Sequence, residues 1–335
     1  MFGEVTKLIE LNDLKQMRIT AIIVTYADRF NLLKQVIDSC LKTGISDIII
    51  VDNDSHKKSK YNLKILSENH KDKIMVLWNA TNLGSAKAYK QGLQEAKSRK
   101  NDNYIWLLDD DNNPRYEALG ALKKYWKEKP NDVIALLSYR PDREQYRKAI
   151  FENDPDLVLG NKNSFYGFHL TNKFFKLFLK KRVSNNKKVV GEIAYAPYGG
   201  MFFHISITDS IGYPNEAYFL YSDDHDWSYR ITKSNKKIHL VLKSVIDDID
   251  TSWSLIDKQS TVFTRIKNAP SSRVYYNVRN RMLFEKNYLV NNKLSYKLNK
   301  LTFTIILFCF CFGKKNYKVF KKALDHANKN YLVKF

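Results

Sequence analysis

The feature that most constrains the fold is an alternation of short β-branched runs with helical patterns along residues 19–108. Residues 19–25 form one such run, which is typical of a strand buried on both faces of a sheet. The alternation predicts βαβ crossovers and a mostly parallel sheet with helices on both faces. The predicted strands are residues 19–25, 47–51, 74–78 and 104–108, and the predicted helices are residues 31–42, 61–70 and 85–99. Ligands of such sheets bind outside the carboxyl ends of the strands.

The pattern changes twice along the rest of the chain. Residues 140–163 are charged and contain Pro141 and Pro155, so they predict a long loop. Residues 173–188 mix apolar and basic side chains and predict an exposed amphipathic helix or hairpin. Order returns at residues 192–203, and beyond about residue 252 the pattern is helical and basic. We therefore expect an α/β domain over residues 1–255 and a basic helical region over residues 256–335.

The chain is strongly basic, with 56 Lys and Arg against 35 Asp and Glu and a net charge of +21. Nucleic acid, an anionic membrane surface and a phosphate-bearing substrate are the three partners that such a charge suits. Cys40, Cys309 and Cys311 lack the spacing of a disulfide framework, and the N-terminus has no secretory pattern. Both observations favour a cytoplasmic compartment.

Residues 301–312 form an apolar stretch that is too short for the roughly 20 residues of a membrane span. Two interpretations remain open for it. Anionic headgroups would attract the lysines around it while its aromatic side chains enter the headgroup boundary, or the stretch is a buried core helix with solvated lysines. The surrounding lysines are Lys293, Lys297, Lys300, Lys314, Lys315, Lys318, Lys321 and Lys322.

Three consecutive carboxylates, Asp109, Asp110 and Asp111, end the fourth predicted strand. Their mutual repulsion is costly unless a cation lies there, and Mg²⁺ or Mn²⁺ prefers such oxygens and keeps diphosphate oxygens in its shell. The alternative is an acidic turn that caps a following helix through Asn112 or Asn113. The position at a ligand-binding edge favours the metal site.

A second acidic cluster, Asp223, Asp224 and Asp226, begins a predicted helix. The helix dipole favours carboxylates at the start of a helix, which explains the presence of one aspartate there but not of a cluster of three. One of them is suited to act as a general base, because apolar walls and neighbouring anions raise a carboxyl pKa. Gly199 and Gly200, further upstream, leave room for close backbone approach to a ligand.

These ordered blocks resemble glycosyltransferase family 2, which has the GT-A fold with a Rossmann-like, mostly parallel sheet. The resemblance extends over about residues 19–253 and depends on six blocks in the same order, at residues 22–26, 50–55, 82–88, 109–111, 199–200 and 223–227. It implies a metal-dependent, inverting transfer of a sugar from a nucleoside diphosphate.

The resemblance also implies a role for each matched position. Thr25, Asp52 and Asn53 correspond to positions that hold the nucleobase, although many relatives have a second aspartate in place of Asn53. The remaining implied residues are Asn82, Gly84 and Lys87 along the nucleotide, Gly199 and Gly200 in the binding site, Asp109 and Asp110 near the ribose and sugar, Asp111 on the metal, and Asp224 as base with Asp223 and Asp226 as its supports.

Two further positions concern the metal and the phosphates. Many relatives have a metal-binding histidine after the base, and the alignment places Asp248 there, with Asp247 one residue away. Residues 274–281 are similar to the Tyr-Tyr-x-x-Arg-Asn segment of the rhamnosyl- and galactofuranosyltransferase branches. Arg279 or Arg281 is therefore expected to meet the donor diphosphate or an acceptor phosphate, the alternative being a basic helix face.

The expected partners follow from these assignments. The donor is UDP-galactofuranose or another UDP-hexose, with dTDP-rhamnose as the alternative, and the acceptor is a lipid-linked cell-surface glycan at the inner face of the membrane. A nucleic-acid-binding protein would not need the two acidic clusters, which repel a phosphate backbone. A nicotinamide-dependent dehydrogenase would need glycines after the first strand, where residues 25–29 contain none.

Overall fold

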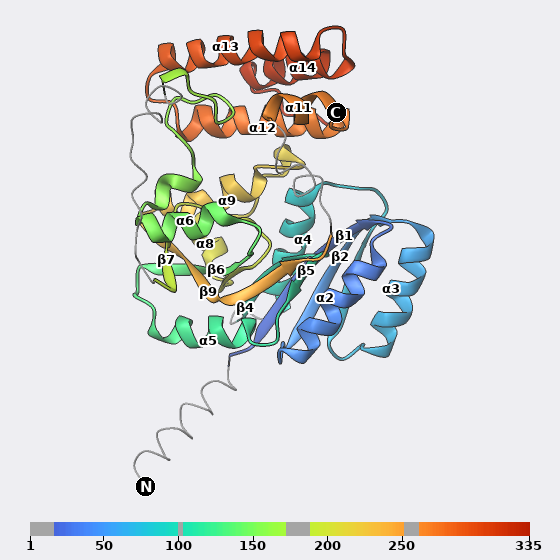
Figure 1. Ribbon diagram of the computed structural model, residues 1–335. Coiled ribbons are helices and arrows are strands. Elements are labelled where there is room, and N and C mark those ends of the chain that lie inside the picture. The colour runs from blue at the N-terminus through green and yellow to red at the C-terminus, as the bar shows by residue number, and fades with distance from the viewer. Residues whose placement is uncertain (1–16, 100–102, 172–187, 251–260) are drawn as a thin grey trace.

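The computed structural model describes residues 17–99, 103–171, 188–250 and 261–335, and Figure 1 shows its ribbon. A central mixed sheet is flanked by helices, and a group of C-terminal helices lies beyond one end of it. The α/β fold class predicted above is confirmed. In the N-terminal half the elements are β1 (Ile19–Ala27), α2 (Phe30–Lys42), β2 (Asp47–Ser55), α3 (Lys57–Asn69), β3 (Ile74–Asn79), α4 (Ser85–Arg99), β4 (Tyr104–Asp109), β5 (Asn112–Pro114), α5 (Ala118–Glu128) and β6 (Val133–Tyr139).

The second half contains shorter elements followed by long helices. These are α6 (Glu144–Glu152), the 3-10 helix η1 (Pro155–Val158), β7 (Val190–Ile193), β8 (Met201–His204), α8 (Ile207–Ile211), the 3-10 helix η2 (Glu216–Tyr218), α9 (Asp223–Lys233), β9 (Lys237–Asp248), α11 (Val262–Asn268), α12 (Ser271–Tyr288), α13 (Lys293–Cys311) and α14 (Lys315–Asn328). Every strand and helix predicted within residues 19–108 is present.

The strand order is β3-β2-β1-β4-β8-β6-β9-β5, with β7 also paired to β9. Strands β1, β2, β3 and β4 are mutually parallel, β8 is antiparallel to both β4 and β6, and β6 and β9 are parallel. Because β8 alone reverses direction between them, the carboxyl ends of β1, β2, β4, β6 and β9 all lie at one edge of the sheet.

Side-chain alternation in β1 divides the core between the two faces of the sheet. Ile22 packs with Tyr89 and Leu93 of α4, whereas Ile23 packs with Leu33 of α2. Both isoleucines are fully buried, which explains the continuous β-branched run in the sequence. Figure 1 shows α2 and α3 on one face and α4 behind the sheet.

Two predicted features differ from the structure. Residues 140–163 contain α6 and η1 rather than only a loop. Pro141 precedes α6 and Pro155 is the first residue of η1, a position where the backbone N–H that proline lacks is not needed for a helical hydrogen bond. Asn112 and Asn113 belong to β5, which pairs with β9, so they cap no helix. The amphipathic segment predicted at residues 173–188 lies, apart from Lys188, outside the described residues.

The C-terminal helices form a third hydrophobic core around Phe303 and Phe320, which includes Phe165 from the middle of the chain. Phe219 and Tyr221, which precede α9, pack against this core. The predicted boundary at residue 255 also falls outside the described residues, and the helical region that the structure describes begins at Val262.

Candidate active site

The predicted site residues gather where the carboxyl ends of the strands meet. Thr25 lies near the end of β1, Asp52 near that of β2, Asp109 at that of β4 and Asp248 at that of β9, and Arg140 follows β6. The antiparallel β8 begins at the same edge, which brings Gly199 and Gly200 beside Asp109 and Ser138. The topology therefore assembles residues that are far apart in the sequence.

The triplet Asp109 to Asp111 is held by a residue that the sequence did not single out. Arg29, one turn beyond β1, donates from Nε to the two oxygens of Asp110 at 2.8 and 2.9 Å and from Nη2 to Asp111 at 2.8 Å. Its Nη1 donates to Asp250 at 2.6 Å. The Thr25 hydroxyl donates to Asp110 at 2.8 Å, so the residues predicted to meet the nucleobase and the sugar contact each other in the interior.

Asp109 is the most exposed member of the triplet. Its Oδ1 accepts from the Tyr89 hydroxyl at 2.7 Å, and its Oδ2 lies 3.8 Å from a guanidinium nitrogen of Arg140. Gly199 lies directly against this group, because a Cβ there would come within 1.9 Å of the Asn112 side chain and 2.7 Å of Asp109 Oδ2. The glycine is thus required by the packing of the acidic cluster itself.

Asp248 is placed beside the triplet, as the alignment predicted, but its oxygens are already used. Asn112 donates to it at 2.8 Å and Arg140 at 2.5 Å, and its side chain is buried. Its neighbour Asp247 is exposed and pairs with Arg115 at 2.8 Å. Of these two aspartates, Asp248 is therefore the one that faces the site. It pairs with Arg140, the arginine that also lies near Asp109.

Burial raises the pKa values of two carboxyls in this cluster. Burial, partly offset by Arg29, raises the pKa of Asp110 to about 6. Burial and the neighbouring Asp109 and Asp110 raise the pKa of Asp111 to about 7. An added cation would favour the charged form of these buried carboxyls.

The donor set fits a hard divalent cation that shares its shell with a substrate. No group of three or more Asp, Glu, His or Cys side chains placed to hold a metal occurs within the described residues. Asp110 and Asp248 are the most deeply buried of these carboxylates and are engaged by arginines. Asp109 is the most exposed, and Asp111 is partly exposed and pairs with Arg29 through one oxygen, so these two are the carboxylates that can reach a cation. Two carboxylates with phosphate oxygens are the usual protein contribution to Mg²⁺ and Mn²⁺ sites in nucleotide enzymes.

The second acidic cluster begins α9 and splits between two surroundings. Asp223 accepts from the Ser85 hydroxyl at 2.7 Å, and burial together with Asp224 raises its pKa to about 7. Burial also raises the pKa of Asp224 to about 7, and Asp109 adds to this rise. The two clusters are therefore electrostatically coupled, although more than a hundred residues separate them.

Asp226 does not belong to this group. It accepts from the hydroxyls of Tyr218 and Tyr288 at 3.2 and 3.0 Å and pairs with Arg230 at 2.5 Å. It lies two residues beyond Asp224, about 200° around the helix, and so faces the C-terminal helices. In the structure Asp226 is engaged by Tyr218, Tyr288 and Arg230, and its role as a support for the base stays a prediction.

The segment expected to line the nucleotide is ordered by Asn53. Its side chain donates to Asn82 and to the Gly84 carbonyl at 3.2 Å each and accepts from the Leu83 backbone at 2.9 Å. Gly84 has a φ of +82°, and a Cβ there would come within 2.1 Å of the Phe219 carbonyl. Asn53, Asn82 and Gly84 therefore fix this loop against the loop before α9.

Lys87 and Asp52, two other predicted nucleotide contacts, differ in their exposure. Lys87 is half exposed on α4 and pairs with Glu216 at 3.4 Å. Asp52 is buried, with Oδ1 accepting from the Ser55 backbone at 3.1 Å. Its Oδ2 has no hydrogen-bond partner among the described residues, which leaves one strong acceptor for an added donor group.

Arg279 has a role different from the predicted contact with phosphate. It is fully buried, and its nitrogens donate to the carbonyls of Ala217, Tyr218 and Val333 and to the side chain of Asn280. Arg281 is likewise engaged, with Glu285 and the Leu159 carbonyl. In the structure these arginines therefore act as internal clamps, and the predicted contact with a phosphate stays a prediction.

Asn280 completes the clamp on the loop before α9. Its amide donates to the carbonyls of Tyr218, Leu220 and Tyr221 at 2.9, 2.7 and 3.0 Å. That loop contains non-glycine residues with positive φ, namely Phe219 at 65°, Tyr221 at 67° and Ser222 at 60°. Such backbone is strained and needs external support, which α12 provides just ahead of Asp223 and Asp224.

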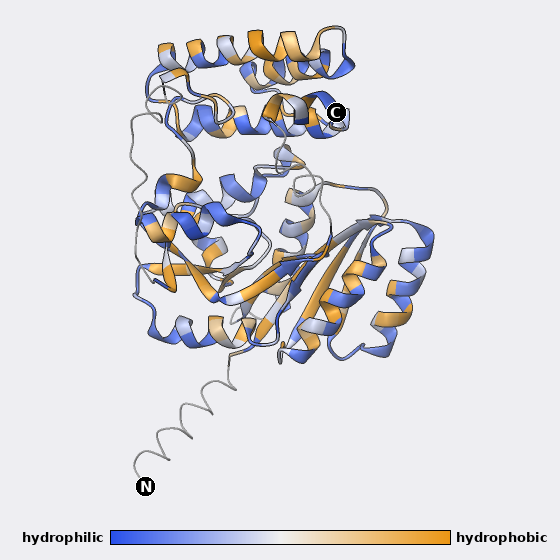
Figure 2. Cartoon of the chain, in the orientation of Figure 1, coloured by the Kyte–Doolittle hydropathy of each residue, from blue (hydrophilic) through white to orange (hydrophobic). Residues whose placement is uncertain are grey.

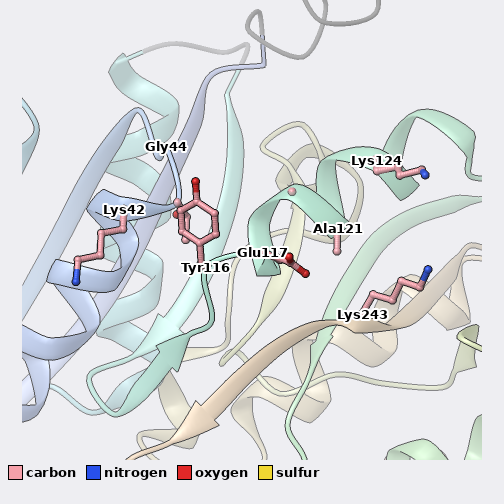
Figure 3. A pocket seen from close by; sticks show the side chains of 9 residues that line it. Lys42, Gly44, Tyr116, Glu117, Ala121, Lys124 and Lys243 are labelled. Carbon is pink, nitrogen blue, oxygen red and sulfur yellow. The ribbon is translucent and has the colours of Figure 1, made fainter.

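A cavity of about 560 Å³ lies away from these residues, between the end of α2 and α5 (Figure 3). It is lined by Tyr116, Glu117 and three lysines, and the Lys42 side chain points away from the others. Lys42 ends α2, which runs opposite to β1, so this cavity is at the amino ends of the strands. None of the predicted site residues lines it.

A mixed sheet of this order, with an acidic triplet after β4 and carboxylates at the start of α9, defines a glycosyltransferase of the GT-A class. The chain belongs to glycosyl transferase family 2, whose model matches residues 20–187, half of the chain. No curated protein is similar enough to this chain to count as a relative.

Solved structures support the same fold at low sequence identity. The mannosyltransferase PcManGT from Pyrobaculum calidifontis, in complex with GDP-Man and Mn²⁺, is 15% identical with a TM-score of 0.50, and the match covers 93% of this chain and 75% of that one. GalNAc-T7 with UDP, GalNAc and Mn²⁺ is 14% identical with a TM-score of 0.53, covering 95% of this chain and 58% of that one.

Proposed function

We propose that this glycosyltransferase moves a sugar from a nucleoside diphosphate to an acceptor hydroxyl with inversion, and that Asp224 is the general base. The observation that carries the proposal is the coupling of the two acidic clusters. Asp224 has a pKa raised to about 7 by burial, and Asp109 of the other cluster contributes to the rise. A carboxyl with such a pKa is poised to accept a proton near neutral pH.

The reaction proceeds in one displacement. The His225 backbone donates to Asp224 Oδ1 at 2.8 Å, which orients the carboxylate and leaves Oδ2 for the acceptor hydroxyl. As that proton passes to Oδ2, the acceptor oxygen bonds to the anomeric carbon and the bond to the diphosphate breaks on the opposite face. A single base and a single displacement give an inverted anomeric centre.

A divalent cation, Mn²⁺ or Mg²⁺, fits beside this base. Asp109 and Asp111 would hold it, with Asp248 positioning Arg140 behind them. When bound, the cation neutralises the charge that develops on the departing diphosphate. Arg29 also pairs with Asp110 and Asp250, and Arg140 pairs with Asp248, which keeps these other carboxylates in place.

A uridine donor is proposed from the buried Asp52, whose Oδ2 has no hydrogen-bond partner among the described residues and would accept from the imide N–H of uracil. The donor is UDP-galactofuranose or another UDP-hexose, with dTDP-rhamnose as the alternative, since thymine presents the same imide. The acceptor is a hydroxyl of a lipid-linked cell-surface glycan on the cytoplasmic side. In this proposal residues 1–255 bind the donor, and residues 256–335 support the base loop and the acceptor side.

A donor panel tests this function. Purified protein with Mn²⁺ and a glycan acceptor is supplied with UDP-galactofuranose, UDP-galactopyranose, dTDP-rhamnose or GDP-mannose, and released nucleotide is measured. Release with one uridine or thymidine donor, and an inverted anomeric signal in the product by NMR, is expected. Retention of configuration, or release with GDP-mannose alone, would contradict the proposal. Calorimetric titration with RNA is the control for the basic-protein alternative.

A further inference from the structure

The outward face of α13 exposes a continuous apolar stripe. Its members recur at alternating intervals of four and three residues, which places them on one side of a helix. Three of them, Leu294, Leu301 and Phe312, have exposed fractions of 68%, 57% and 72%. The stripe, which we call the α13 stripe, comprises Leu294, Leu298, Leu301, Ile305, Phe308 and Phe312.

The opposite face of the same helix is fixed to the protein. Phe303 and Leu307 are fully buried in the C-terminal core. Asn299 donates to the Asn163 carbonyl at 2.9 Å and accepts from the Leu170 backbone at 2.9 Å. Among the described residues, α13 is the one helix that is long and apolar enough to cross a membrane. Crossing would break these contacts, so the helix is suited to lie along a surface.

Positive charge surrounds the stripe and has no local counter-charge. The sequence contains no Asp or Glu between Glu285 and Asp325. Lys297 and Lys293 are exposed on α13, Lys314 and Lys315 lie at the start of α14, and three further lysines lie within α14. Of the exposed lysines on these two helices and at the start of α14, Lys322 lies over the rings of Tyr275 and Phe335, and the others are Lys293, Lys297, Lys314, Lys315, Lys318 and Lys321.

The stripe lies at the outer end of the molecule. In Figure 1, α13 is at the edge opposite α5, with α12 between it and the part that carries the sheet. Figure 2 shows hydrophobic residues along this outermost helix, where no other described element covers them. An apolar strip with a basic border at the end of a molecule is typical of an interfacial helix.

We propose that the α13 stripe seats this protein on an anionic lipid surface, with the apolar side chains at the headgroup boundary and the lysines on the headgroup charges. Charge complementarity selects this occupant over a second copy of the chain. A second α13 would bring further lysines and no carboxylate, whereas anionic headgroups neutralise them. The proposal does not depend on the identity of the donor or on the catalytic base.

The test uses a double variant with a matched control. Leu301→Ser/Ile305→Ser removes two exposed side chains one turn apart on α13. Tyr61→Ser/Ile65→Ser makes the same change, at the same spacing, on α3, where the two side chains are 66% and 41% exposed. Full-length proteins are mixed with vesicles of phosphatidylcholine and phosphatidylglycerol, or of phosphatidylcholine alone, and the bound fraction is measured by flotation.

The parent and the α3 variant are expected to bind anionic vesicles equally, and the α13 variant at least tenfold more weakly. Binding of the parent is expected to fall with added salt and to be weaker on neutral vesicles. Equal binding of all three proteins, or no binding of the parent, would overturn the proposal. A parent that elutes as a dimer, binds no vesicle and becomes monomeric in the α13 variant would identify the stripe as a contact between copies.

Discussion

Arg29 Nε lies 2.8 and 2.9 Å from the two carboxylate oxygens of Asp110, and the other two nitrogens of the same guanidinium reach Asp111 and Asp250. One side chain thus holds three carboxylates, two of them in the triplet that ends β4. The pair is largely buried, with the Arg29 side chain 17% and the Asp110 side chain 5% exposed. Removing either partner would leave charge in a poorly solvated place.

We expect Arg29→Ala to destabilise the protein by about 3 kcal/mol in the presence of EDTA, because three carboxylates lose their shared counter-charge. Added Mn²⁺ should restore more stability to this variant than to the parent. Thermal unfolding followed by circular dichroism measures both effects. The control is Arg18→Ala, whose ion pair with Asp47 is more exposed and should change stability little. Equal unfolding temperatures for the two variants would contradict the prediction.

The rate of transfer should depend on the protonation of Asp224. Burial raises its pKa to about 7, and only the deprotonated carboxylate can accept a proton. Activity is therefore lost as pH falls through about 7, by about tenfold per unit at lower pH, and is full above it. The measurement is kcat/KM between pH 5.5 and 8.5, with nucleotide binding at each pH as the control. A flat profile would exclude Asp224 as the base.

Replacement of the α9 aspartates should separate chemistry from structure. Asp224→Asn keeps the shape but cannot take a proton, so transfer should fall by about 10²–10⁴-fold while nucleotide binding persists. Asp226→Asn lies among Tyr218, Tyr288 and Arg230 and should instead lower the unfolding temperature with transfer within about tenfold of the parent. The reverse outcome would assign the base to Asp226.

Asn280→Ala should impair transfer from a distance. Three carbonyls of the strained loop before α9 would lose their donor, at a cost of about 1–3 kcal/mol for buried unsatisfied groups. We expect kcat to fall, nucleotide affinity to stay nearly constant and the midpoint of the pH profile to shift. Asn287→Ala, an exposed position on the same helix, is the matched control. A loss of stability without a change in kcat or pH midpoint would make Asn280 purely structural.

Asp248→Ala should raise the Mn²⁺ concentration needed for half-maximal activity. Arg140 would lose its main partner and pair instead with Asp109, which is 3.8 Å away in the present structure. Asp247→Ala should leave the titration unchanged, because that side chain is exposed and pairs with Arg115. Calorimetric titration of UDP with and without Mn²⁺ provides a second readout. A shift caused by Asp247→Ala alone would contradict the placement.

The sheet was predictable because its signals are local. Strands buried on both faces appear as apolar runs, and the helix between the third and fourth strands was predicted with the bounds observed, Ser85–Arg99. The prolines of residues 140–163 predict a loop, whereas proline also begins helical turns, as Pro155 does in η1. Asp226 could have been separated from Asp224 by helical period alone.

The partners of the site residues were less accessible from sequence. Arg29 contacts Asp110 and Asp250 across 81 and 221 residues, and Arg140 contacts Asp248 across 108. Such pairs depend on the sheet topology, which no short motif encodes. The charge of Arg279 and the segment that contains it predict a contact with phosphate. Its full burial, in contrast, results from the packing of α12 on the loop before α9, which the sequence does not indicate.

Arg279 and Asn280 donate hydrogen bonds to the backbone ahead of Asp223. The chain therefore cannot be cut into two independent parts near residue 255, where its composition changes. A fragment ending near residue 255 would retain every carboxylate of the two acidic clusters but would lose the donors that hold three carbonyls and a run of positive-φ residues in position. The α/β part and the C-terminal helices are accordingly expected to unfold as one cooperative unit in a single transition. The helices hold the candidate active site in position as much as the sheet does.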